Sequence, residues 1–371
     1  MQDKGFFAGK RSWSRLKDRT LGDYLPPYLA KVAKRRRRIV IVDAFAGAGK
    51  FDDGTAGSPL IICQAAEKHA KGRYDAVFIN KDRGSHTKLS HLLSRWVEAG
   101  SVVTLRGSAE EWLKDLGTQL GDRTVFLYMD PFGLKGCEFS ILQPFLDRDR
   151  RYSTEILTSL DAGAIHRLAT RNVVLDGRKD PSTMRSYHDR LSAVLGGDYW
   201  KDLMWDTGSS AEERIIAVMS GYRSQLQSAG MLYTGSCPIR DGHDGKIQRI
   251  VTFCSRHEDA LVIMNDNMHR AYHEAVEGSR WDCTLPGIRE SEMNNHQAAL
   301  RDVVLRTVTE FPGQSRRQVR VRIAQSHFME YADRDYNAAV KTLDEDGRVG
   351  WEDVRGTRRH NDDMKLFPSD T

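Results

Sequence analysis

The segment Ile39-Val-Ile-Val-Asp43 leads directly into Ala-Phe-Ala-Gly47-Ala-Gly49. A continuous run of apolar, β-branched residues that ends in an acid is typical of a parallel strand buried on both faces. Glycines in the turn let the backbone approach a ligand closely, and the acid can receive an amino group or a ribose hydroxyl. The turn is not a full dinucleotide fingerprint, because Asp52 stands where GxGxxG needs its last glycine, and no GK[ST] follows. A tight structural turn is the alternative interpretation.

Further strands and helices alternate after this segment, which predicts an α/β fold: a Rossmann-like sheet with helices on both faces. Residues 170–230 are expected to be mostly helical, with an exposed loop at 172–181. Two later strands, at 247–254 and 260–264, are expected to close the sheet as an antiparallel hairpin. The earlier strands are expected at 76–79, 102–105, 125–129 and 155–157, and the helices at 59–71, 88–99 and 109–120.

The last part of the chain has a different pattern. Helical spacing is found at 296–311, from Ser315 to about Ala324, and from Asp333 to Gly347. Two short strands around a polar turn are expected at 348–354 and 364–367. Three helices followed by a hairpin predict a winged helix-turn-helix, so the expected domains are residues 1–285 and 294–371.

Composition is that of an ordinary globular protein, with 371 residues, 40% hydrophobic residues and a net charge of +5. The five cysteines are odd in number and form no CxxC pair, which favours reduced thiols. No apolar run approaches the roughly 20 residues of a spanning helix, and the first residues lack a signal-peptide pattern. We therefore expect a cytoplasmic protein with no membrane partner.

Several of these segments together resemble the three-Cys-motif partner family over roughly residues 20 to 275. The resemblance is carried by the turn at 43–49 with Gly57-Ser-Pro-Leu60, by Phe78-Ile-Asn-Lys-Asp82, by Tyr128-Met-Asp-Pro-Phe-Gly133, by Phe253-Cys-Ser-Arg-His257 and by the stretch from Met264 to Met268. The family is regarded as having a class I methyltransferase-like fold and as associated with radical-SAM-like proteins that bear three cysteines. The resemblance implies S-adenosylmethionine as cofactor, held by Asp43, Phe45, Gly47, Gly49, Asn80 and Asp82.

The end of the second strand departs from the family pattern. Asn80 stands where the family tends to carry Glu, an acid that would accept hydrogen bonds from both ribose hydroxyls of the cofactor. Side chains two residues apart in a strand point the same way, so Asp82 could substitute if the strand end bends. Weak cofactor binding is the alternative.

The end of the fourth strand carries Asp130-Pro131-Phe132-Gly133. The motif resembles the (D/N)PP(Y/F) sequence of enzymes that methylate exocyclic amines of bases. The Asp carboxylate and the Pro carbonyl would accept hydrogen bonds from the amine, and an aromatic side chain beside them can stack on the base. We therefore expect Asp130, Pro131 and Phe132 to be catalytic; a strand-ending turn with a buried Phe is the alternative.

Two other groups of residues have spacing or charge of interest. Cys254, His257, His269 and His273 have a spacing reminiscent of a zinc site, but Cys254 falls inside an expected strand, and no metal is expected. Basic clusters suggest contact with nucleic-acid phosphates, although the expected recognition helix is acidic, which favours phosphate contact or protein docking over base reading. The expected nucleic-acid contacts are Arg35, Arg36, Arg37, Arg38, Arg316 and Arg317.

The leading hypothesis is a methyltransferase that acts on an amine of a nucleic-acid base or nucleotide-like group. The alternative is a non-catalytic methyltransferase fold that scaffolds a radical-SAM-like three-Cys protein on nucleic acid. Asn80 favours the scaffold, and the intact Asp-Pro-Phe-Gly motif favours the enzyme. A transcription regulator is disfavoured by the acidic helix.

Overall fold

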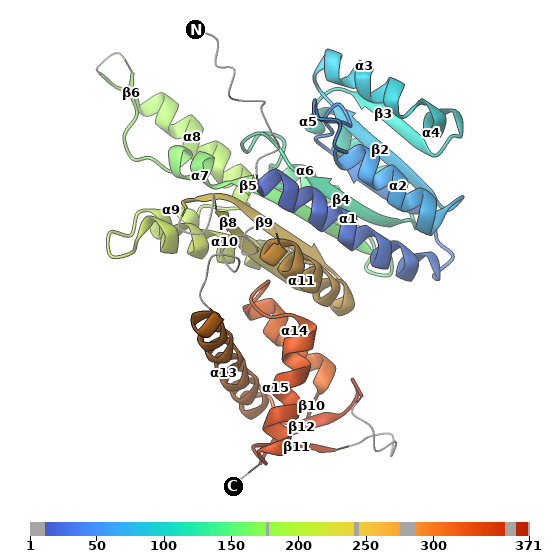
Figure 1. Ribbon diagram of the computed structural model, residues 1–371. Coiled ribbons are helices and arrows are strands. Elements are labelled where there is room, and N and C mark those ends of the chain that lie inside the picture. The colour runs from blue at the N-terminus through green and yellow to red at the C-terminus, as the bar shows by residue number, and fades with distance from the viewer. Residues whose placement is uncertain (1–11, 176–177, 241–244, 275–285, 353–360, 370–371) are drawn as a thin grey trace. The chain divides into compact units, whose positions relative to one another are not determined.

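Seven strands form the main sheet of this protein (Figure 1). They are β1 (Ile39–Asp43), β2 (Tyr74–Asn80), β3 (Val102–Arg106), β4 (Thr124–Met129), β5 (Thr154–Asp161), β8 (Tyr233–Arg240) and β9 (Ile247–Ser255). Their order is β3-β2-β1-β4-β5-β9-β8, and β9 is antiparallel to both of its neighbours while the other adjacent pairs are parallel. This is the Rossmann-like sheet of the methyltransferase fold, as the sequence predicts.

The computed structural model describes residues 12–175, 178–240, 245–274, 286–352 and 361–369. The chain divides into two compact units, residues 1–257 and 258–371, called below the N-terminal and C-terminal units. The division lies before the segment at 278–293 in which the sequence suggests a boundary. No described helix combines the length and the apolar character needed to cross a membrane.

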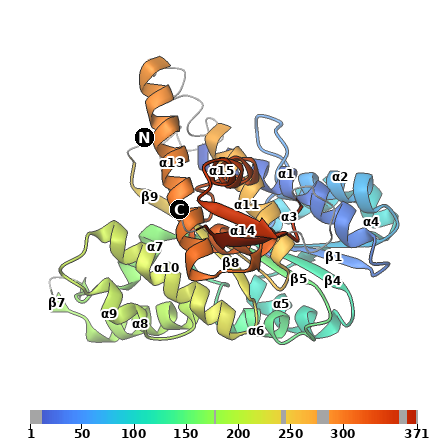
Figure 2. The same ribbon diagram turned by 90° about the horizontal axis from the view of Figure 1, so that it is seen from below.

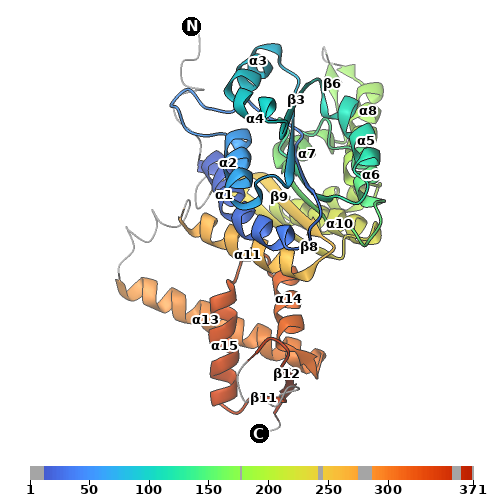
Figure 3. The ribbon, with the colours of Figure 1, turned by 90° about the vertical axis from the view of Figure 1, so that its right-hand side faces the viewer.

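Helices cover both faces of the sheet in the N-terminal unit (Figure 3). Alternate residues of β1 point to opposite faces of the sheet. Val40 and Val42 join the core formed with α5 and α6 on one face. On the other face, the ring of Phe126, in the neighbouring strand β4, lies 5.7 Å from the Tyr24 ring of α1. The first face carries α5 (Ala109–Gln119), α6 (Phe139–Leu146), α8 (Pro181–Leu195) and α10 (Ala211–Ser228), and the second carries α1 (Ser12–Ala33) and α2 (Ser58–Ala70).

The remaining elements of this unit are short. The expected helix at 88–99 is two helices, α3 (Arg83–Leu92) and α4 (Ser94–Glu98), which meet at Leu93. The expected loop at 172–181 contains two paired strands, β6 (Val174–Leu175) and β7 (Arg178–Lys179). The other two helices are α7 (Ala162–Leu168) and α9 (Trp200–Met204).

One predicted strand is wrong. Residues 260–264 lie in a helix, α11 (Glu258–Tyr272), whose buried Leu261, Met264 and Met268 recur at helical spacing. The partner of β9 in the sheet is instead β8, beside which α10 packs (Figure 2). β8 contains Pro238, a residue tolerated in a sheet only at edges, strand starts and bulges, and β8 is an edge strand.

The C-terminal unit contains the expected three helices and the expected hairpin. After α11 come α13 (Pro286–Glu310), β10 (Gln314–Ser315), α14 (Arg316–Ser326), α15 (Asp333–Glu345), β11 (Val349–Glu352) and β12 (Lys365–Pro368). The three strands form an antiparallel sheet in the order β10-β12-β11. Ser315 caps α14, as predicted, by accepting a hydrogen bond from the Gln318 N–H. Within this unit, the Asn265 side chain of α11 donates a hydrogen bond to the Tyr331 carbonyl and accepts one from the Met329 N–H.

Candidate functional site

The turn after β1 contains a buried carboxylate. Asp43 is 1% exposed, and its Oδ2 accepts a hydrogen bond of 2.7 Å from the Ser58 hydroxyl, while Oδ1 accepts one of 3.1 Å from the Phe45 N–H. Burial raises the pKa of Asp43 to about 7, against these two bonds, which lower it. The carboxylate is thus fixed in place, and its charge is poised near neutral pH.

The two glycines of this turn have different surroundings. Gly49 has a φ of +86°, and a Cβ at this position would lie 2.5 Å from Leu92 Cδ2, so both the backbone conformation and the surroundings favour glycine. A Cβ on Gly47 would meet no atom within 4 Å, and Gly47 is exposed. Open space above Gly47 is what a ligand resting on this backbone needs.

Phe45 is packed into the protein. It is half-buried against the core that contains α5 and α6, and its ring lies 3.0 Å from where a Cβ of Gly136 would be. The predicted cofactor contact of Phe45 therefore stays a prediction, and the side chain also has a packing role.

The end of β2 gives Asn80 and Asp82 separate roles. Asn80 is buried, and its Oδ1 accepts a 2.8 Å hydrogen bond from the Asp82 N–H. Asp82 is exposed and caps α3, because its Oδ1 accepts a 2.7 Å bond from the Ser85 N–H. Hydrogen bonds from the backbone and the side chain of Ser85 lower the pKa of Asp82. The amide oxygen of Asn80 and one carboxylate oxygen of Asp82 are therefore already bonded within the chain, and the predicted cofactor contacts of both residues stay predictions.

The end of β4 presents an aromatic ring to solvent. Phe132 is 97% exposed, which excludes the alternative of a buried Phe in a strand-ending turn. A large apolar side chain held fully in water is informative because its burial on a ligand would be favourable.

Asp130 is surrounded by cations that the sequence does not predict. The Lys17 ammonium of α1 donates a hydrogen bond to Asp130 Oδ2, and these side chains are only 10% and 17% exposed. Arg249 Nη1 lies 3.9 Å from Asp130 Oδ1 and donates a 2.8 Å bond to the Pro131 carbonyl. Burial lowers the pKa of Lys17, and the charge of Asp130 opposes that shift. Both groups expected to bind an acceptor amine therefore have partners within the chain.

Asp43, Asn80 and Asp130 lie at the same edge of the sheet. β1 pairs with β2 on one side and with β4 on the other, all parallel, so their carboxyl ends meet. Open α/β sheets bind ligands at this edge, where the strand order reverses, and here the reversal is between β1 and β4.

The predicted nucleic-acid contacts lie elsewhere. Arg35–Arg38 precede β1, at the amino edge of the sheet, and β1 has five residues, about 17 Å of strand. In the C-terminal unit, Arg317 pairs with Glu258 and Asp259, and Arg316 donates to the Asn337 side chain. Contact by Arg316 and Arg317 with phosphate stays a prediction, and their existing partners argue against it.

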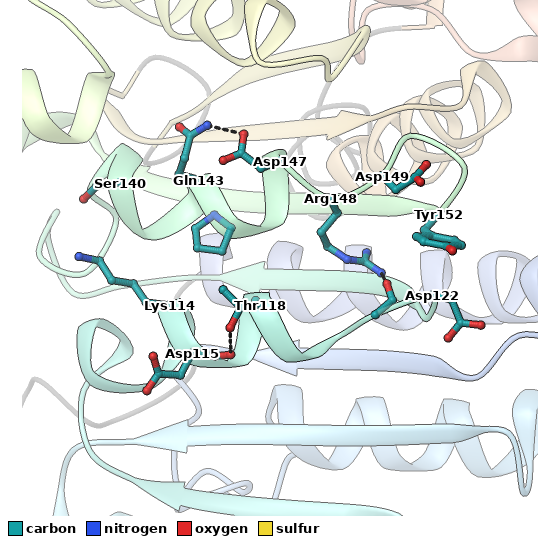
Figure 4. A pocket seen from close by; sticks show the side chains of 13 residues that line it. Lys114, Asp115, Thr118, Asp122, Ser140, Gln143, Asp147, Arg148, Asp149 and Tyr152 are labelled. Atoms are coloured by element: carbon teal, nitrogen blue, oxygen red, sulfur yellow. Dashed lines mark hydrogen bonds between the residues drawn. The ribbon is translucent and has the colours of Figure 1, made fainter.

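A cavity of about 730 Å³ lies between α5 and α6 (Figure 4). Its lining includes Gly121 and Asp122 before β4 and Tyr152 before β5, so it too is at the amino edge and is distinct from the Asp43 turn. In the described ranges, no three His, Cys, Asp or Glu residues are placed to hold a metal ion.

Comparison with known proteins gives weak likenesses. No protein-family model matches the sequence, and no curated protein matches it. Among solved structures, TYW2 from M. jannaschii in complex with AdoMet has a TM-score of 0.29 and 11% identity, over 61% of this chain and 74% of that one. The METTL16 methyltransferase domain has a TM-score of 0.32 and 8% identity, over 62% and 80%. A "possible exported protein" from Bordetella parapertussis has a TM-score of 0.28 and 13% identity, over 62% and 66%.

Proposed function

We propose that this protein is an S-adenosylmethionine-dependent methyltransferase that acts on an amine of a nucleic-acid base or nucleotide-like group. The observation that carries the proposal is the exposed Phe132 ring, which follows Asp130 and Pro131 in the chain. The same edge of the sheet holds the buried Asp43 and the open space above Gly47. Proteins of this fold place ligands at that edge.

The residues at the β1 and β2 ends fit the cofactor. When bound, S-adenosylmethionine supplies an electrophilic methyl group. Asp43 would orient its amino-acid part, the space over Gly47 would admit it, and the Asn80 amide would bond a ribose hydroxyl. An amide offers fewer acceptor sites than a carboxylate, so the affinity should be lower than with an acid at this position.

The residues at the β4 end fit an aromatic amine. Such an amine is a poor nucleophile because its lone pair is delocalised into the ring. Hydrogen bonds from its N–H groups to the Asp130 carboxylate and the Pro131 carbonyl would favour a pyramidal nitrogen, and Phe132 would stack on the base. Because the Lys17 ammonium is bonded to Asp130 Oδ2, the acceptor must share or displace that cation.

Isothermal calorimetry tests the cofactor site. S-adenosylmethionine should bind the wild-type chain with measurable heat, and Gly47→Val should abolish binding, because its side chain fills the open space. Gly47 has no positive φ and no near neighbour, so the variant should unfold at the wild-type temperature. No heat with the wild type at millimolar ligand would refute the proposal.

A second function is favoured by one observation. Lys17 and Arg249 already bond Asp130 and the Pro131 carbonyl, an arrangement that also suits a silent methyltransferase fold. Such a protein would be a scaffold for the radical-SAM-like three-Cys protein that the sequence resemblance implies. A scaffold requires that Asp130→Ala fully complements a deletion strain, whereas an enzyme requires that it does not.

For the C-terminal unit we propose a winged helix. Its support is the element order from α13 to β12, with a short strand before α14 and a hairpin after α15. The first turn of α15 is acidic, which favours protein docking over base reading. Deletion of residues 286–371 tests the docking role. If the shortened chain lost partner binding but kept S-adenosylmethionine binding, the result would support that role.

A further inference from the structure

Two arginine-rich segments far apart in the sequence meet at the amino edge of the sheet. Residues 34–38 precede β1 and residues 147–152 precede β5, and together they contain eight basic and two acidic side chains. The excess of six positive charges is larger than the +5 of the whole chain. The sequence predicts only the first segment as an interaction site.

Specific contacts join the two segments. Arg37 Nη1 donates a 2.7 Å hydrogen bond to the Arg151 carbonyl, and its guanidinium lies 4.8 Å from the centre of the Tyr152 ring. Arg151 lies 5.7 Å from the same ring. The two segments therefore form one surface, called here the arginine surface: Arg35, Arg36, Arg37, Arg38, Arg150 and Arg151.

Two buried arginines, Arg148 and Arg256, hold the second segment in place by hydrogen bonds. Arg256 donates to the carbonyls of Leu146 and Asp149 at 2.6 and 2.9 Å, and Arg148 donates to Thr154 Oγ1 at 2.7 Å. Burial and the nearby charge of Arg150 lower the pKa of Arg256. The nearby charges of Asp149 and Asp147 oppose this shift without cancelling it, so the acids of the chain relieve only part of the repulsion among cations at this edge.

Carboxylates neutralise only part of the arginine surface. Arg38 pairs with Asp75, and Arg151 pairs with Asp149 at 2.6 Å. Arg36 and Arg150 are exposed and form no ion pair with any residue that the structure describes, and Arg36 has the unusual φ of +57°. Arg36 lies three residues after the end of α1, and because a positive φ is normally taken by glycine, an arginine here has a conformational cost.

The chemistry of the arginine surface favours one kind of partner. No large apolar side chain of either segment is exposed, so the surface lacks the apolar centre typical of protein interfaces. It also lacks an open aromatic platform for single-stranded bases, because Arg37 and Arg151 lie over Tyr152. Guanidinium groups without such elements suit the phosphates of a duplex.

We propose that the arginine surface binds the phosphate backbone of double-stranded nucleic acid, without base specificity, at the edge of the sheet opposite the methyl-transfer site. The inference rests on the proposed function, since it assigns the form of the substrate. The two edges are about 17 Å apart along β1, about five base pairs of duplex rise. A duplex that occupies both must therefore be longer than that.

Fluorescence anisotropy of the full chain with a labelled 20-base-pair DNA duplex, from 50 to 200 mM KCl, tests the proposal. Each phosphate contact contributes about −0.9 to the slope of log affinity against log salt. Replacing two arginines, Arg36→Gly with Arg150→Gln, should make the slope shallower by about 1.8 and weaken binding at least about tenfold at 100 mM. Arg36→Gly relieves the left-handed strain, so folding is not expected to suffer.

The matched control is Arg185→Gln with Arg190→Gln, which removes two exposed arginines from α8 and should leave the slope unchanged. The proposal would be overturned if the chain showed no salt-dependent binding of the duplex, or if the two double variants gave equal slopes. It would also be overturned if the chain bound anionic phospholipid vesicles and not the duplex. Calorimetry with S-adenosylmethionine on the same samples separates the two claims. Duplex binding without cofactor binding would refute the proposed function and leave the role of the arginine surface intact. Cofactor binding without duplex binding would refute the role of the arginine surface and leave the proposed function intact.

Discussion

Replacing Lys17 by Met should test how strongly α1 is tied to the end of β4. The change keeps most of the side-chain volume but removes the cation bonded to Asp130 Oδ2, where both partners are largely buried. Loss of one member of a buried ion pair costs about 3–5 kcal/mol, because the other charge is left uncompensated.

Arg249 reduces that cost. Its Nη1 is 3.9 Å from Asp130 Oδ1, which corresponds to an attraction of about 4 kcal/mol at an effective dielectric constant of 20. We therefore expect Lys17→Met to lower the free energy of unfolding by about 3 kcal/mol, the lower end of the range. The double variant Lys17→Met, Asp130→Asn should lose less than the sum of the single variants, with a coupling of about 2 kcal/mol.

Urea unfolding followed by tryptophan fluorescence measures all four proteins of this cycle. A coupling below about 0.5 kcal/mol would show additive, independent sites and would refute a Lys17–Asp130 pair. The same Lys17→Met protein should still bind S-adenosylmethionine, because Lys17 contacts the acceptor side of the site.

Asp43→Asn should flatten the pH dependence of stability. The pKa of Asp43 is about 7 in the native state and about 3.9 in the unfolded state, so ionisation of the wild-type residue costs nothing below pH 4 and lowers the free energy of unfolding by about 4 kcal/mol as the pH rises through 7. Urea titration at several pH values measures this, and identical pH dependence in the two proteins would contradict it. Gly49→Ala should cost about 2–4 kcal/mol in the same assay, through its positive φ and the contact with Leu92. Gly54→Ala, with a φ of +81° and no near neighbour, should cost only about 1–2 kcal/mol, and equal losses would refute the steric argument. Phe132→Ala should change the free energy of unfolding by no more than about 0.5 kcal/mol. It should weaken acceptor binding by about 1–3 kcal/mol, measured as a higher KM, and an unchanged KM would exclude stacking.

Local pattern was sufficient for the five parallel strands of the sheet and for the polar residues at their carboxyl ends. Parallel buried strands are continuous apolar runs, so β1 and β4 stand out, and the polar residues after them fall at one edge by topology alone. The same reasoning failed at 260–264, where a short apolar run fits strand or helix equally well and the helical spacing of Leu261, Met264 and Met268 decides. β8 was missed because a proline interrupts it.

Contacts across the fold could not be predicted from local pattern. Lys17 precedes Asp130 by 113 residues and lies in α1, a helix that Pro26 and Pro27 obscure in the sequence. Nothing near Arg249 or Arg151 in the chain indicates that they meet the β4 end or the basic run. Asp82 has a local role that is not among those expected from the sequence. It lies three residues before Ser85, and one of its carboxylate oxygens accepts a hydrogen bond from the Ser85 N–H as the cap of α3.

Transfer of a labelled methyl group from S-adenosylmethionine to nucleic acid tests the central claim most directly. The wild-type chain should incorporate label, and Asp130→Ala should lower incorporation by about 100-fold or more, while calorimetry shows that cofactor binding is kept. Equal incorporation by both proteins, or none by a wild type that binds the cofactor and the duplex, would contradict the assignment of Asp130 as the residue that receives the acceptor amine.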